Sequence, residues 1–217
     1  MTDSPTLVVR GEAFREVPPE VARFAVTVSA RSRNRPEALA RLAERTATVR
    51  GLIDGYGDAV ERRETGQLWV HPELKRSGER VAAYVANATT TVTVTDFGVL
   101  GELMLRLADE DQTGVAGPWW DLRPDSPVHR ETRRAAVADA LSRAREYADA
   151  LGAEVTGLLE LSDSGPADRP MMLTRAAFGG GAEAAPEIEL DPQVQTVRAA
   201  VEARFRISAP RLDDVPG

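Results

Sequence analysis

The sequence contains no cysteine, only two histidines and no apolar run long enough to cross a membrane. Without cysteine, the chain has no disulfide, no thiolate nucleophile and no sulfur ligand for a metal. A membrane helix needs about 20 consecutive apolar residues, and a signal peptide needs a basic start followed by an apolar run. The opening MTDSPTLVVRGEAF provides neither. We therefore expect a cytoplasmic protein that does not insert into a membrane.

Lysine is nearly absent as well, because Lys75 is the only one among 27 basic residues. The formal net charge is −7, so the chain as a whole is repelled by phosphate backbones and by anionic lipid headgroups. We therefore expect no nucleic-acid partner. A chain of 217 residues, 42% of them hydrophobic, is long enough for one domain, which we expect to span residues 1–217.

Regular alternation is the clearest pattern that the sequence does contain. In residues 191–208, DPQVQTVRAAVEARFRIS, apolar side chains alternate with arginine and glutamate. This pattern predicts a long strand in a sheet that is covered on one face. Residues 21–32 alternate in the same way. Shorter patterns predict strands at 7–14, 67–71, 80–95, 113–122 and 155–161, and Pro118 within one of them requires a sheet edge or a bulge.

Apolar residues at spacings of three and four predict three helices. They begin at Pro36, after Asp96 as the expected N-cap, and at Ser126 with Pro127. The expected apolar faces are Leu39, Leu42, Thr46, Val49 and Ile53; Leu100, Leu103, Met104 and Leu107; and Val137, Ala140, Leu141, Ala144, Tyr147, Ala148 and Leu151. Strands and helices in this order predict an α+β fold.

Two adjacent tryptophans stand out in the predicted strand at 113–122. Trp119 and Trp120 must point to opposite faces of that strand. We expect one of them in the core and the other exposed, as aromatic residues at interfaces are.

A long connection at about 162–192 separates the last two predicted strands, which we expect to pair with each other. It is rich in glycine, alanine, proline and acid, yet it carries Met171, Met172 and Phe178. Connections of this length are either disordered or functional. Flexible methionines suit adaptable contacts, so these residues either dock on a neighbouring subunit or partner, or fold back onto their own domain.

No residue cluster forms a catalytic, metal or cofactor signature. The two histidines, His71 and His129, are each followed two residues later by a glutamate, but a site would need these groups to converge in space. The acids at 109–111 lack the spacing of a calcium loop. The arginines at 31, 33 and 35 lack interleaved aromatics, which is typical of a solvated turn and leaves an anion site as the alternative.

The order of these elements resembles the SIMPL-domain family. The resemblance is carried by VVRGEAF before a long alternating strand, RPEALARLAERTATVRGLI as first helix, VAAYVANATTTVTVTDFGVLGELM as strand into helix, RETRRAAVADALSRAREYADALG as long helix and VRAAVEARFRI as closing strand. It implies a curved, mostly antiparallel sheet with amphipathic helices packed on one face. It also implies no established enzymatic activity, no cofactor, and oligomers among some members.

The sequence therefore predicts a non-catalytic protein that self-associates or binds a protein partner, with Trp119, Trp120 and the apolar residues of the long loop as the candidate contacts. The first alternative is a small-molecule-binding protein with a pocket between sheet and helices, near one of the tryptophans. A hydrolase that uses acidic residues is a third hypothesis, for which no acid can be nominated.

Overall fold

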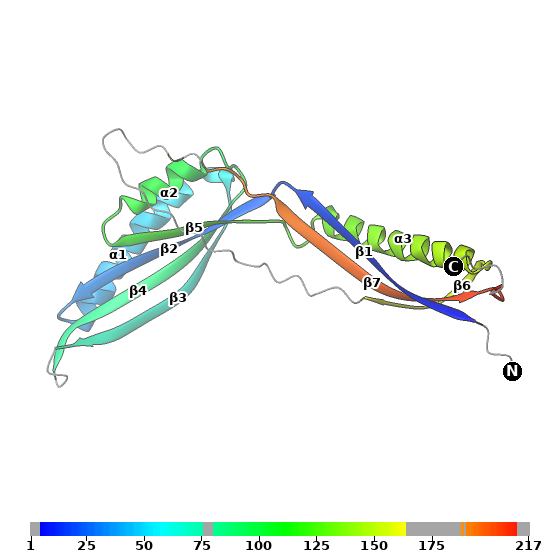
Figure 1. The fold of residues 1–217 in the computed structure, drawn as a ribbon. Coiled ribbons are helices and arrows are strands. Elements are labelled where there is room, and N and C mark those ends of the chain that lie inside the picture. The colour runs from blue at the N-terminus through cyan, green and yellow to red at the C-terminus, as the bar shows by residue number, and fades with distance from the viewer. Residues whose placement is uncertain (1–4, 76–79, 164–187, 189, 212–217) are drawn as a thin grey trace. The chain divides into compact units, whose positions relative to one another are not determined.

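The computed structural model describes residues 5–75, 80–163, 188 and 190–211. These residues form seven strands, three α-helices and one short 3-10 helix (Figure 1). The chain divides into two compact units. The first contains the described residues up to Val17, those of 124–163 and those from Val194 on; the second contains those of 18–123 and 188–193.

The first unit is a three-stranded antiparallel sheet with one long helix. The strand order is β1-β7-β6 (Figure 1). Strands β6 and β7 pair, as the sequence predicted. The bounds are Thr6–Val17 for β1, Val155–Asp163 for β6, Gln195–Ile207 for β7 and Pro127–Ala150 for the helix α3.

Small side chains let α3 approach this sheet closely. The buried stripe of α3 consists of residues four apart, which are Thr132, Ala136, Ala140, Ala144 and Ala148. On the facing strand, a Cβ added to Gly11 would lie 2.2 Å from the carbonyl oxygen of Ala136. The predicted stripe included the larger Val137 and Tyr147, which are exposed. That part of the prediction is wrong because such close packing leaves room only for small residues at the centre.

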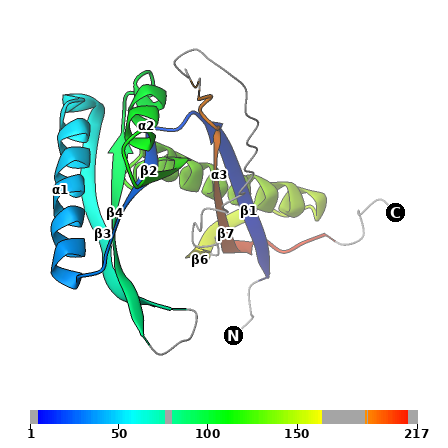
Figure 2. The same cartoon turned by 90° about the vertical axis from the view of Figure 1, so that its left-hand side faces the viewer.

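The second unit is a four-stranded antiparallel sheet in the order β3-β4-β2-β5. Both α-helices of this unit contribute to one hydrophobic core with it, and α1 runs along the sheet (Figure 2). The bounds are Val21–Ser32 for β2, Arg35–Asp54 for α1, Gly57–Ala59 for the 3-10 helix η1, Val60–Leu74 for β3, Val81–Val94 for β4, Leu100–Ala108 for α2 and Thr113–Asp121 for β5.

Large side chains fill the core of the second unit. Phe24 and Val26 of β2 are fully buried against leucines of α2 and Ile53 of α1. Strand β5 lies at the sheet edge, and its register with β2 shifts between Arg23 and Ala25. Pro118 therefore sits in an edge strand with an irregular register, as the sequence predicted.

The α+β class and the antiparallel pairing are confirmed, and two further details differ from the sequence-based expectation. The strands form two sheets, because β1 and β2 belong to different sheets on either side of Pro18 and Pro19. The N-cap of α2 is Val99, whereas the Asp96 carboxylate accepts a hydrogen bond of 2.9 Å from the Gly98 amide in the preceding turn. None of the described helices combines the length and hydrophobicity needed to cross a bilayer.

Candidate functional site

The tryptophan pair divides between core and surface. Trp120 packs edge-on against Phe97, with ring centroids 4.9 Å apart and an interplanar angle of 80°, and adjoins the core of the second unit. Trp119 is 38% exposed. The strand's alternation thus separates the two rings as expected, and a contact role for Trp119 remains a prediction. Met171, Met172 and Phe178 lie outside the described residues.

His71 and Glu73 have separate partners in the described structure. His71 stacks on Trp69, with centroids 4.9 Å apart and rings within 13° of parallel. Its neighbour Glu73 accepts a hydrogen bond of 2.7 Å from the Arg31 guanidinium, and this bond and the charge of Arg31 hold the pKa of Glu73 below its usual value. Within the described residues, no group of three or more His, Asp or Glu side chains could hold a metal ion.

An apolar groove lies in the first unit, between α3 and the edge strand β6. Its volume is about 360 Å³. We call it the α3–β6 groove. The residues that line it are almost all apolar, namely Val137, Ala140, Leu141, Val155, Thr156, Gly157, Leu158, Leu161, Ala203 and Phe205.

The groove exists because α3 covers only part of the sheet. The helix lies over β1 and β7 and hardly over β6. Leu158 pairs in register with Phe205, and Leu161 with Ala203, so both leucines are on the sheet face that α3 covers elsewhere. They remain 55% and 48% exposed. The side chains of Leu158 and Leu161, which a helix would normally cover, therefore stay in contact with solvent.

Strand β6 is an edge strand of the described sheet. Its one strand neighbour there is β7, so no other described strand pairs with the outer backbone N–H and C=O groups of residues 155–162. Glu160, on the face away from α3, pairs with Arg204 at 3.4 Å. An unpaired strand edge beside an apolar groove is the arrangement that recognises an extended polypeptide, since backbone bonds supply affinity and pockets take alternate side chains.

Sequence reasoning predicted the strand at 155–161 but not this site. The available signal was the run Leu158, Leu159, Glu160, Leu161, which carries more leucine than an alternating, half-covered strand needs. In the second unit, the edge strand β3 also exposes large apolar residues, Leu68, Trp69 and Leu74.

This geometry defines the class of the protein: an α+β fold with two antiparallel sheets and an open apolar groove. The SIMPL family model, described as a protein of unknown function (DUF541), matches residues 7–205, and the chain belongs to this family.

Two curated relatives are each called 26 kDa periplasmic immunogenic protein, one from Brucella melitensis and one from Brucella abortus. Each is 26% identical over 199 residues, covering 86% of this chain and 78% of the relative. The expectation of a cytoplasmic protein is therefore wrong: relatives that match most of the chain are named as periplasmic proteins, which points to export.

A solved structure from Burkholderia cenocepacia, named for a suspected amidohydrolase or peptidase activity, is 17% identical. The match covers 60% of this chain and 33% of that one, with a TM-score of 0.27. A likeness this low carries no argument about activity.

Proposed function

We propose that this chain is an exported, non-catalytic interaction module that takes up an extended polypeptide segment along β6 and in the α3–β6 groove. The observation that carries the proposal is the exposure of Leu158 and Leu161 beside an unpaired strand edge. Export is supported by the names of the two Brucella relatives. A second copy of the chain is the first partner to test, because it is present in any pure sample.

The test is the native mass, measured by light scattering over a concentration series. We expect an oligomer. The double substitution Leu158→Ser with Leu161→Ser should raise its dissociation constant at least tenfold, because each exposed leucine buries apolar area worth about 1 kcal/mol or more on association. The matched control is Leu39→Ser with Leu68→Ser, two exposed leucines of the second unit.

If the control weakens the assembly as much as the β6 variant does, β6 is not the contact. A monomer at every concentration would remove self-association and leave a heterologous partner, for which peptides of alternating apolar sequence are the direct probes. Loss of peptide binding in the β6 variant but not in the control would then support the site.

A small apolar ligand in the same groove is the second candidate function. The volume of about 360 Å³ falls within the range of ligand pockets, roughly 300–1,000 Å³. This alternative would be favoured over strand addition if the protein is a monomer that binds one equivalent of an apolar fluorescent probe, and if Leu161→Glu abolishes this binding.

A further inference from the structure

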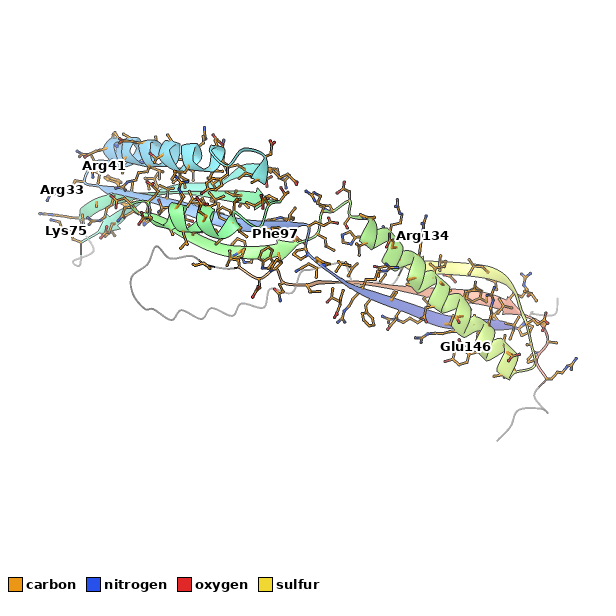
Figure 3. The ribbon with its side chains drawn as sticks, turned by 90° about the horizontal axis from the view of Figure 1, so that it is seen from above. Arg33, Arg41, Lys75, Phe97, Arg134 and Glu146 are labelled. Atoms are coloured by element: carbon orange, nitrogen blue, oxygen red, sulfur yellow. The ribbon has the colours of Figure 1, made fainter. Side chains whose placement is uncertain are left out.

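One end of the second unit gathers positive charge from four elements. The residues are the described parts of 31–41, 73–75 and 80–84, which we call the basic tip: the end of β2, the start of α1, and the facing ends of β3 and β4. Figure 3 shows Arg33, Arg41 and Lys75 at the same end of the unit. The tip holds six cationic side chains and two acidic ones, a surplus of four positive charges.

Both acids of the tip are already engaged. Glu37 forms an ion pair with Arg41 and accepts a hydrogen bond of 2.7 Å from the Ser32 hydroxyl. Glu73 pairs with Arg31 at 2.7 Å. Four cations of the tip form no ion pair within the described part of the chain, and these are Arg33, Arg35, Lys75 and Arg80.

The tip also carries an exposed apolar pair. Leu74 and Val81 face each other in register, and they are 53% and 44% exposed. Beyond them the Lys75 amide donates a hydrogen bond of 2.8 Å to the Arg80 carbonyl. Pairing of β2 with β4 ends at Ser32 and Tyr84. The ends of β3 and β4 therefore project about 10 Å beyond β2, at roughly 3.3 Å per residue.

The described residues of the second unit outside the tip carry a surplus of negative charge. The remaining described residues of the second unit carry seven cations and thirteen acids. The acids at 109–111 precede β5 and lie near Ser29, whose amide bonds to the Gln112 carbonyl. Val81 lies seven residues before Ala88, the β4 partner of Val28, so the outer ends of β3 and β4 are about 23 Å from that level, whereas Arg31 is about 10 Å from it.

We propose that the basic tip docks on an anionic phospholipid surface. Four unpaired cations match the phosphates of the headgroups, and the exposed Leu74 and Val81, adjacent in the chain to Lys75 and Arg80, suit the boundary between headgroups and acyl chains. A soluble polyanion would use the charges but has no need of the apolar pair. The net charge of −7 predicts repulsion between anionic lipid and the chain as a whole, whereas the proposed contact involves one end of the second unit only.

The test is sedimentation of the full chain with vesicles of phosphatidylcholine, with and without phosphatidylglycerol. We expect binding only to the anionic vesicles, falling as salt is raised. Each cation near such a surface contributes about a fivefold change in binding, so Lys75→Ser with Arg80→Ser should weaken binding about 25-fold. The control is Arg133→Ser with Arg134→Ser, two exposed arginines of α3 with the same loss of charge (Figure 3).

The apolar pair separates a lipid surface from a soluble anion. Leu74→Ser with Val81→Ser keeps every charge of the tip and should weaken vesicle binding several-fold while the circular dichroism spectrum is unchanged. Three results would each overturn the proposal. The first is an equal loss of binding in the tip and α3 charge variants, and the second is binding to neutral vesicles. The third is unchanged vesicle binding by Leu74→Ser with Val81→Ser together with full displacement of the protein by soluble polyphosphate.

Discussion

The two units hold themselves together by different means. The second has a core of large side chains: of the largest fully buried residues in the described chain, all but Thr132 belong to it. The first is held by a row of alanines on α3 that meets β1 at Gly11. A helix packed on small residues comes close to its sheet but buries little apolar area. The first unit consequently keeps larger apolar residues, such as Leu158 and Leu161, at its surface.

The largest expected difference between the units comes from removing a big core side chain. Phe24→Ala in the second unit should lower the free energy of unfolding by about 3–5 kcal/mol, because it leaves a cavity where a fully buried ring was. Denaturant titration followed by circular dichroism measures this loss. The control is Phe14→Ala in the first unit, where the ring is 72% exposed; its effect should stay within about 0.5 kcal/mol. Equal losses would contradict the described cores.

The close approach in the first unit is tested by adding a single methyl group. Gly11→Ala places a Cβ 2.2 Å from the Ala136 carbonyl oxygen and 2.6 Å from the Cβ of Ala140. Relief requires α3 to move away from the sheet, so we expect a loss of about 1–3 kcal/mol in denaturant titration. Gly157→Ala on β6 is the matched control, since a Cβ there meets nothing within 4 Å. A neutral result at Gly11 would mean that α3 does not pack this closely.

Acid should act on the second unit through Glu73, with a small effect. The hydrogen bond and charge of Arg31 lower the pKa of Glu73 below its ordinary value of 4.5. A lowered folded-state pKa stabilises the fold above the unfolded value, and this contribution is lost as the pH falls through the folded value. NMR titration of the carboxyl should show a midpoint below 4.5, which returns toward 4.5 in Arg31→Ser. An unchanged midpoint in that variant would assign the shift to another cause.

The sequence predicted the elements that have one exposed and one buried face. Strands β2 and β7 alternate strictly because each has a covered face, so both were found nearly to their ends. Strand β3 was predicted only at 67–71, although it spans Val60–Leu74, because it is exposed on both faces and has no alternation to read. The division into two sheets depends on pairings between residues far apart in the chain, which no local pattern encodes.

The candidate groove was harder to predict for the same reason. Its leucines are visible in the sequence, but their exposure depends on where α3 lies on the sheet. That position is set by Gly11 and by alanines over a hundred residues away. The tryptophan pair, in contrast, was placed correctly on opposite sides, because adjacent residues in any strand diverge.

The pairing of β1 with β7, from Thr6 with Arg206 to Val17 with Gln195, has a consequence for the order in which the protein can form. All four strands of the second sheet are present once the chain has emerged to residue 123, whereas β1 must wait for a partner made almost two hundred residues later. Local sheets close sooner than distant ones. The unit that bears the β6 edge is thus completed after the second sheet, and a partner that needs this edge can bind only once residues 195–207 have been made.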